Sequence, residues 1–341
     1  MCTLHVGSVL LGGSKKRADG QISEKVSKHY RLWYDRLVLE IQRAFPNEGY
    51  IVQHTENLVG LFTCVFVRKA LVHSLKDVAI TTVKRGMNGH YGNKGAIVAR
   101  FVVEDSSLCF INCHLAAGQG HKNARNRDLG AILDEKSVFS ASGDALGYVG
   151  GGDGSMILDH EVCFVRKPNQ AAPRQRRGLI PLQLNGDLNY RIDLRREAVV
   201  SSVKSGDISY LLQHDQLLKE MATNPCFRLH SFTEPSITFA PTYKYDRRSD
   251  EYDTSEKRRI PAWCDRILHR ARDPERVQNI FYRRYEPNIS DHRPVCGGYT
   301  VEIKKVQHAE RAKQLQIAKS LWVKEERNLL DEAQAFYLGV F

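Results

Sequence analysis

The sequence predicts an α/β (α+β) fold in which mixed or antiparallel sheets are flanked by helices. Apolar and β-branched runs of strand length recur along the 341-residue chain, and several follow one another with no helix between them. Stretches with helical spacing lie before, between and after these runs. Because a doubly wound parallel sheet needs a helix between successive strands, this order favours mixed or antiparallel pairing.

The first half of the chain is expected to begin with a loop over residues 1–20, which carry glycines and lysines. One apolar face at helical spacing then predicts a helix over Ile22–Phe45. Strands are expected at Leu58–Val67, Val78–Val83, Gly95–Val103 and Leu108–Leu115. A helix should follow over Asn123–Phe139, and a surface loop rich in Gly, Ser and Asp over Ser140–Ser155.

The second half is expected to hold two helices, three strands and a long terminal helix. The helices are Leu194–Lys204 and Ile208–Met221, the second capped by Asp207. The strands are Ile237–Tyr245, Ala262–His269 and Cys296–Ile303. From Lys305 onward one face is apolar: Leu315, Ala318, Trp322, Leu329, Ala333 and Phe336. We therefore expect one domain over 1–303, with 140–183 as a loop or insert, and over 304–341 a helix that docks on it or leads to a neighbouring domain.

The net charge of +11, from 50 Lys and Arg against 39 Asp and Glu, favours an anionic partner. Nucleic acid, phosphorylated small molecules and an acidic membrane face all remain open. The eight cysteines show no CxxC or paired Cys/His spacing, which disfavours a zinc site. No segment reaches the ~18–20 apolar residues of a membrane span, and no signal peptide is visible. We expect a cytoplasmic protein with reduced thiols.

The stretch Asn185–Arg191 follows an apolar run, so it is expected where a buried strand ends. Gly186 permits a tight turn there. Asp187 and Asn189 are two residues apart and point the same way in an extended segment. The carboxylate can take a proton from water, and the amide can donate to a phosphate oxygen. Taken alone, the stretch is equally typical of an Asx-rich turn that closes a strand.

Four other strand-end stretches carry reactive side chains, although each alone also suits a turn or a structural role. They contain Asn93 and Lys94, His114, Asp265, and the adjacent Asp291 and His292. Three carboxylates, two histidines and two amides together favour metal-assisted hydrolysis of a phosphate ester, with Mg²⁺ as the cation. No cysteine is followed by Arg at the sixth position, which disfavours a covalent cysteinyl-phosphate route.

With these motifs the chain resembles the inositol polyphosphate 5-phosphatases of the endonuclease/exonuclease/phosphatase superfamily. The matching segments are Gly92–Gly95, Asn112–Gly118, Gly186–Ile192, Pro241–Asp246, Pro261–Leu268 and Ser290–Val295. The resemblance runs from about Leu58 to Tyr299, and nuclease members share the GDxN and SDH motifs but not WCDRIL. It implies a DNase I-like four-layer sandwich. It also implies Mg²⁺-dependent removal of the 5-phosphate from phosphatidylinositol 4,5-bisphosphate, the 3,4,5-trisphosphate or soluble inositol polyphosphates.

The resemblance also implies roles for individual residues. Asp187 would orient or activate the attacking water, and Asn189 would hold the scissile phosphate. His292, oriented by Asp265, would stabilise the transferring phosphoryl group, which His114 would contact. Asp291 would lie at the metal. The implied substrate-binding residues are Asn93, Lys94, Arg191, Tyr243, Lys244, Lys257 and Arg259; a solvated charge run is the alternative for those between Arg247 and Arg259.

Two departures from the family pattern change what we expect of this chain. The family begins with a strand bearing Trp-Asn and a strand ending in Gln-Glu, whose glutamate is a main metal ligand, and neither is found here. Val6–Leu10 resembles the family's segment just after the Gln-Glu strand, so two core strands and a metal carboxylate are expected to be missing. We therefore predict poor Mg²⁺ binding and little activity. Glu24 is an alternative ligand, disfavoured because it lies in a predicted helix.

The second departure is the basic segment Val165–Gln183, which interrupts the approach to the Asn185 stretch. Our hypothesis is a retained intron, since removing it would join Glu161–Phe164 to Leu184 in one apolar strand. If it is translated, it should form a disordered basic loop beside the site.

Three functions therefore remain open from the sequence. The first is a 5-phosphatase that acts on a phosphoinositide or inositol polyphosphate, peripheral on the cytosolic face of anionic membranes and with no nucleic acid partner. The second is a DNase I-like phosphodiesterase. The third is a phosphoinositide-binding pseudoenzyme, because the metal glutamate is missing.

Overall fold

The computed structural model describes residues 4–10, 24–86, 89, 91–142, 153–160, 181–271 and 274–339. The chain divides into two compact units, Met1–Ile303 and Lys304–Phe341. The first holds every strand within the described ranges, and the second holds one long helix, α6 (His308–Gly339).

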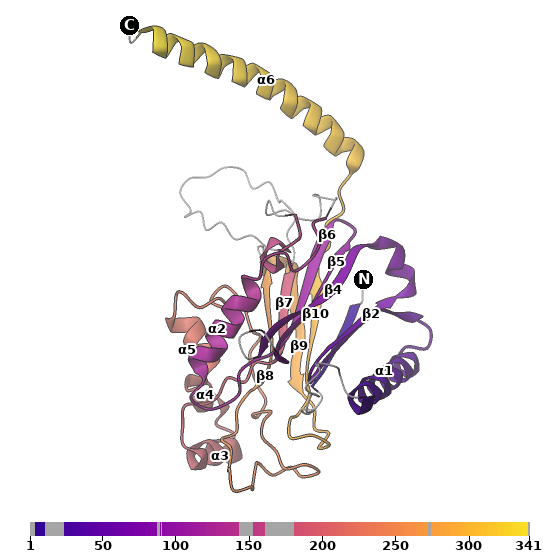
Figure 1. The fold of residues 1–341 in the computed structure, drawn as a ribbon, viewed down its shortest axis with the longest axis vertical. Coiled ribbons are helices and arrows are strands. Elements are labelled where there is room, and N and C mark those ends of the chain that lie inside the picture. The colour runs from indigo at the N-terminus through magenta and orange to yellow at the C-terminus, as the bar shows by residue number, and fades with distance from the viewer. Residues whose placement is uncertain are drawn as a thin grey trace. The chain divides into compact units, whose positions relative to one another are not determined.

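A five-stranded mixed sheet forms the centre of the first unit (Figure 1). Its strands, in spatial order, are β4 (Leu75–Gly86), β5 (Tyr91–Val103), β6 (Ser106–His114), β7 (Pro181–Asp187) and β8 (Asp265–Ala271). β6 and β7 run parallel, and the other neighbours are antiparallel. The parallel pair makes both β6 and β7 end at the same edge of the sheet.

A second layer of strands faces this sheet in two pieces. One piece has the order β1 (Leu4–Leu10), β3 (Leu61–Arg68) and β2 (Tyr50–Leu58), and the other pairs β9 (Val277–Arg284) with β10 (Val295–Val301). All of these pairs are antiparallel. Mixed and antiparallel sheets were expected from the order of the apolar runs.

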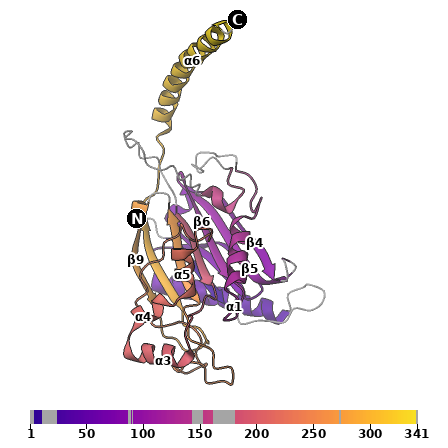
Figure 2. The same cartoon turned by 90° about the vertical axis from the view of Figure 1, so that its left-hand side faces the viewer.

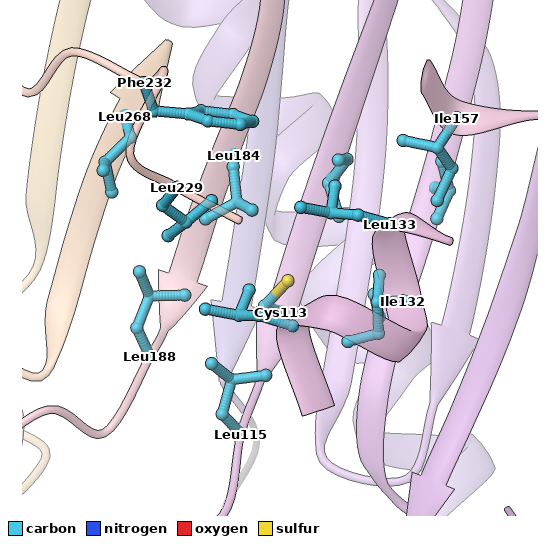
Figure 3. Close-up of a cluster of buried hydrophobic side chains, with 14 of the residues drawn as sticks. Cys113, Leu115, Ile132, Leu133, Ile157, Leu184, Leu188, Leu229, Phe232 and Leu268 are labelled. Carbon is cyan, nitrogen blue, oxygen red and sulfur yellow. The ribbon is translucent and has the colours of Figure 1, made fainter. Parts of the chain in front are cut away.

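The core fills the interfaces between four stacked layers, because successive side chains of a strand point to opposite faces of its sheet. Phe62, Cys64 and Phe66 of β3 pack against Tyr30 of α1 (Glu24–Ala44). The intervening β3 residues, including Val65, face Phe101 of β5 across the two strand layers. On its other face the five-stranded sheet packs against α2 (Lys122–Leu133), as Figure 3 shows for Ile132 and Leu133 beside Cys113. The order is therefore helix, sheet, sheet, helix.

Three further helices lie beside the lower part of the sheet in both views (Figures 1 and 2). They are α3 (Arg196–Ser205), α4 (Ile208–Gln213) and α5 (Gln216–Thr223). Trp263 lies in an apolar cluster that includes Val199 of α3 and Leu211 of α4. Short 3-10 turns occur at η1 (Lys69–Ser74), η3 (Ile157–His160) and η4 (Pro274–Arg276). Asp207 caps α4 as predicted, because its carboxylate accepts a hydrogen bond from the backbone N–H of Tyr210 at 3.0 Å.

The structure corrects several sequence-based assignments. Residues 4–10, expected to be a loop, form β1, and β2 and β9 were not predicted. The expected helix 208–221 is two helices, because Asp215 starts a new one by accepting from the N–H of Leu218 at 3.0 Å. The expected strand Ile237–Tyr245 is an irregular segment, held by isolated bridges at Tyr243 and Tyr245. Pro241 within it removes a backbone donor that a regular ladder would need.

Some predicted features lie wholly or partly outside the described residues. These are most of the loop Ser140–Ser155, the side chain of Glu24, and the segment Val165–Gln183 except for its last three residues. Those three, Pro181–Gln183, lie in β7 and pair with β6 and β8. None of the helices within the described ranges is long and apolar enough to span a bilayer.

Candidate active site

Three adjacent strands place His114, Asp187 and Asp265 side by side. In the register of the sheet, His114 of β6 pairs with Asp187 of β7, and Asp187 pairs with Asp265 of β8. Gly186 makes this close packing possible, because it has a φ of +125° and a Cβ there would lie 2.1 Å from the carbonyl oxygen of Cys113. The result is a row of an imidazole and two carboxylates at one edge of the sheet.

Asp187 is held by the residue that the sequence pairs with it. Its Oδ1 accepts from the backbone N–H of Asn189 at 3.0 Å, and its Oδ2 accepts from Nδ2 of Asn189 at 3.0 Å. Asn189 has a left-handed φ of +57° and also donates from Nδ2 to the carbonyl of Leu115 at 3.2 Å. Both residues are buried. In this arrangement the amide of Asn189 orients Asp187, while the prediction that it holds the scissile phosphate remains a prediction.

Arg191 continues the same network rather than facing solvent. Its Nη2 donates to Oδ1 of Asn189 at 2.5 Å, and its Nε donates to the backbone carbonyl of Asn189 at 3.0 Å. Its guanidinium lies over the ring of Tyr243, 4.5 Å from the centroid, and that ring lies 4.7 Å from the ring of His292. Arg191 and Tyr243, both predicted to bind substrate, thus connect the Asp187 turn to His292.

Lys94 and His114 form a second pair beside Asp187. Nζ of Lys94 lies 2.6 Å from Nε2 of His114, and Nε2 lies 3.6 Å from Oδ2 of Asp187. Burial lowers the pKa of His114 to about 4, and Lys94 and His292 add to this effect while Asp187 opposes it. Burial also lowers the pKa of Lys94. His114 is therefore neutral near pH 7, so Nε2 accepts a hydrogen bond from Lys94.

His292, in contrast to His114, is positively charged near pH 7. Its Nδ1 donates to Oδ2 of Asp265 at 2.9 Å. Burial opposes the charge, but the charge and hydrogen bond of Asp265, with the charges of Asp187 and Asp291, outweigh burial and raise the pKa of His292 to about 9. Asp265 is also held by Thr242, whose hydroxyl donates to Oδ2 at 2.7 Å. An imidazolium therefore faces the buried carboxylate of Asp187.

Backbone pairing brings the Tyr243 and His292 segments together. Tyr243 exchanges two hydrogen bonds with Ala262 and bridges to His292, and Tyr245 donates its N–H to the carbonyl of Asp291 at 2.9 Å. Arg293 is buried and holds the 246–250 loop through the carbonyl of Ser249 and the carboxylate of Asp250. The loop with Asp291 and His292 is thus fixed from both sides.

The remaining predicted substrate residues lie around this centre with fewer contacts. Lys244 lies 3.7 Å from Oδ1 of Asp253, and the backbone N–H of Arg259 donates to Oδ2 of the same carboxylate at 2.8 Å. Arg259 also acts electrostatically on Tyr243. Asn93 is exposed at the start of β5, and Lys257 is exposed in the 254–259 segment. Lys244 and Arg259 thus both contact Asp253, Arg259 through its backbone, and both Arg259 and Lys257 are exposed.

The Mg²⁺ expected from the sequence needs oxygen ligands, and the site offers few that are uncommitted. The carboxylate of Asp187 is engaged by Asn189, and that of Asp265 by His292 and Thr242. Oδ1 of Asn112 is buried without a hydrogen-bond partner among the described residues. Within the same residues, no group of three or more His, Cys, Asp or Glu side chains could hold a metal ion. The described residues thus do not fit a divalent cation on their own.

Sequence reasoning missed two supports of the site. Thr242 was not singled out, although its place directly before Tyr243 in a matched motif was a signal. Arg266, next to Asp265, is fully buried and donates to Asp215 at 2.9 and 3.0 Å and to Glu234 at 2.5 and 2.7 Å. This paired charge joins the start of β8 to the cap of α5, which fixes the strand that carries Asp265.

Comparison with curated proteins shows relatives over most of the chain. A family model described as endonuclease/exonuclease/phosphatase family 2 matches residues 14–298. The chain is 45% identical over 332 residues to a probable inositol polyphosphate 5-phosphatase of Schizosaccharomyces pombe, covering 96% of this chain and 26% of that protein. It is 38% identical over 277 residues to synaptojanin of Caenorhabditis elegans, covering 81% and 21%. The chain thus spans about a quarter of these relatives or less.

Solved structures agree with the fold. The inositol polyphosphate 5-phosphatase domain of SPsynaptojanin, in complex with inositol (1,4)-bisphosphate and calcium ion, matches with a TM-score of 0.71 and 30% identity over 97% of this chain and 83% of that chain. A Cimex nitrophorin nitric oxide complex matches with a TM-score of 0.58 and 19% identity over 88% and 87%. The second likeness concerns the fold alone. The predicted α/β fold class, a DNase I-like sandwich, is confirmed.

Proposed function

Because this chain belongs to the endonuclease/exonuclease/phosphatase family and, within it, to the inositol polyphosphate 5-phosphatases, we propose that it removes the 5-phosphate of inositol phosphates. Its substrates would be a phosphoinositide, either phosphatidylinositol 4,5-bisphosphate or the 3,4,5-trisphosphate, or a soluble inositol polyphosphate. The observation that carries the proposal is the row of His114, Asp187 and Asp265 across three adjacent strands, with the His292 imidazolium facing it.

The chemistry follows from the charges of these groups. The cationic His292 and the ammonium of Lys94 attract a phosphate dianion and stabilise the negative charge of the transferring group. Asp187 is oriented by Asn189, and each of its oxygens keeps a further lone pair, so it can accept a proton from the attacking water. His114, neutral beside Lys94, orients that ammonium. Lys244 and Arg259 would recognise a second phosphate of the substrate.

A divalent cation, Mg²⁺, is part of this proposal, with Asp291 as its candidate ligand in this chain. Such a cation would supply positive charge that offsets the negative charge of a phosphate. The relative of known structure holds calcium, which like Mg²⁺ takes oxygen ligands. Since the described residues do not complete a metal site, we expect weak Mg²⁺ binding and slow turnover. We also propose that the protein works peripherally on the cytosolic face of membranes with anionic lipids, consistent with its net charge of +11.

The test is phosphate release from a short-chain phosphatidylinositol 4,5-bisphosphate and from inositol 1,4,5-trisphosphate, with and without Mg²⁺. Phosphorus NMR of the product should show loss of the 5-phosphate. Asp187→Asn should reduce the rate by about 100-fold or more. Asp193→Asn is the matched control, because Asp193 lies on the same turn but is exposed and accepts from Gln216. Equal rates in the two variants would contradict the role of Asp187.

One observation favours a second candidate, a phosphoinositide-binding pseudoenzyme: the absence of a three-ligand metal group among the described residues. The same assay separates the two functions. Calorimetric binding of inositol 1,4-bisphosphate with no phosphate release at any Mg²⁺ concentration would favour the binding protein. Nicking of plasmid DNA without phosphate release from either inositol substrate would favour a nuclease instead.

A further inference from the structure

Helix α6 is 32 residues long and presents apolar side chains that nothing in its own unit covers. At 1.5 Å per residue it is about 48 Å long. All of its described side chains are exposed. Leu315, Trp322, Leu329 and Phe336 are 48%, 61%, 50% and 68% exposed. Apolar surface of this extent marks a contact site for another molecule.

The spacing of these residues points to a helical partner. The four positions 315, 322, 329 and 336 are separated by seven residues each, and Ala318 and Ala333 lie on the same face. A seven-residue apolar repeat sustained over four repeats is typical of a helix that packs lengthwise against another helix. Docking in a lipid surface needs no such repeat.

The charges on α6 are separated along its length. The first half, residues 308–324, has four basic side chains and one acidic one: Arg311, Lys313, Lys319 and Lys324 against Glu310. The second half, residues 325–339, has four acidic side chains and one basic one: Glu325, Glu326, Asp331 and Glu332 against Arg327. The helix dipole favours acids near the first turn and bases near the last, so stabilisation of the isolated helix does not explain this arrangement.

We propose that α6 is an interaction surface for a second copy of this chain, with the two helices packed antiparallel. The antiparallel arrangement sets the basic half of each helix against the acidic half of the other, whereas a parallel pair would bring like charges together. It also keeps the apolar repeat in register. With a two-fold axis through residue 322, Leu315 of one copy lies opposite Leu329 of the other, and the two Trp322 side chains lie opposite each other. In this register Lys313 lies opposite Asp331, and Lys319 lies opposite Glu325.

The pairing is tested by sedimentation equilibrium of the full chain over about 1–100 µM. The chain of 38.8 kDa should sediment with twice that mass. One variant reverses the acidic half (Glu325→Lys, Glu326→Lys, Asp331→Lys, Glu332→Lys), and another reverses the basic half (Arg311→Glu, Lys313→Glu, Lys319→Glu, Lys324→Glu). Each alone should weaken the dimer by on the order of 100-fold, because attraction along the helices becomes repulsion. A mixture of the two, or a chain carrying both reversals, should dimerise again.

The apolar repeat has its own matched pair of variants. Leu329→Ser should weaken the dimer, and Leu338→Ser should not, because Leu338 lies nine residues further on the opposite side of the helix. Circular dichroism would verify that each variant keeps its helix. A wild-type chain that stays monomeric, including one that binds anionic vesicles as a monomer, would overturn the proposal. Single reversals that dimerise as tightly as the wild type would overturn the antiparallel pairing.

Discussion

Replacing Asp265 by Asn tests whether this carboxylate keeps His292 positively charged. Burial opposes the imidazolium, and Asp265 overcomes burial, so the pKa of His292 is about 9 against its ordinary value of 6.5. Asn keeps the shape of the side chain but has no charge, and only the attractions of Asp187 and Asp291 remain. We expect the pKa of His292 to fall to roughly 6.5 or below in Asp265→Asn.

The size of the effect follows from the two pKa values. At about pH 7.5, His292 would be roughly 97% protonated with a pKa of about 9 and roughly 9% protonated with a pKa of about 6.5. Phosphate release that depends on the imidazolium should therefore fall by about tenfold at this pH. The alkaline limb of the pH profile should also move to lower pH, because the variant loses its proton earlier.

Stability gives a second readout of the same interaction. A histidine whose pKa rises on folding contributes stability that is fully present below pH 6.5 and is lost as the pH rises through about 9. For His292 this contribution is about 3 kcal/mol. Urea unfolding of the wild type should show this loss between the two pH values, and Asp265→Asn should not.

The pKa itself is measured by NMR titration of histidine-labelled protein in a buffer with a chelator, so that no bound cation alters it. His292→Asn assigns the signal. Asp250→Asn is the matched control, since Asp250 is an exposed carboxylate bonded to Arg293, the next residue in the chain. A His292 pKa that stays within about 0.5 of the wild-type value in Asp265→Asn would refute the assignment of its charge to Asp265.

Three other substitutions test neighbouring contacts. Thr242→Val removes the hydroxyl that donates to Asp265 and should slow phosphate release about three- to tenfold. Thr242→Ser keeps the hydroxyl and should stay near the wild-type rate. Equal rates in the two variants would contradict a role for this hydrogen bond. Lys94→Met removes a charge that lowers the pKa of His114, so NMR titration should show that pKa rising above about 4, and an unchanged value would argue against the pair. Arg191→Met frees the amide of Asn189 and should lower the free energy of unfolding by about 2–4 kcal/mol. Arg195→Met, an exposed control nearby, should change it by less than about 0.5 kcal/mol.

The sequence predicts the strands of the site better than it predicts their supports. Apolar runs that end at His114 and at Asp187, and the run that contains Asp265, are visible because burial imposes a pattern on strands. The register that sets these residues side by side depends on how the strands pair, which no local pattern encodes. β9 was missed because it is an edge strand with few buried residues, Val277 and Tyr282 among them.

Side-chain orientation was beyond sequence reasoning for a similar reason. Asn189 was expected to face a phosphate, but its direction depends on the carbonyl of Leu115 and on Arg191, which become its neighbours only in the folded chain. Thr242 lies in a matched motif, but its contact with Asp265 depends on a residue 23 positions further along the chain. The motifs mark the segments of the site, whereas hydrogen bonds made only in the folded chain fix the side chains within them.

The residues of the candidate site are held mainly by one of the two strand layers of the sandwich. His114, Asp187 and Asp265 belong to β6, β7 and β8, and backbone hydrogen bonds tie the Tyr243 and His292 segments to the residues just before β8. The facing layer is in two pieces, and inner-facing residues of β8, such as Ile267, remain partly exposed beneath it. The row of His114, Asp187 and Asp265 and the imidazolium of His292 are therefore held by one sheet and the segments bonded to it.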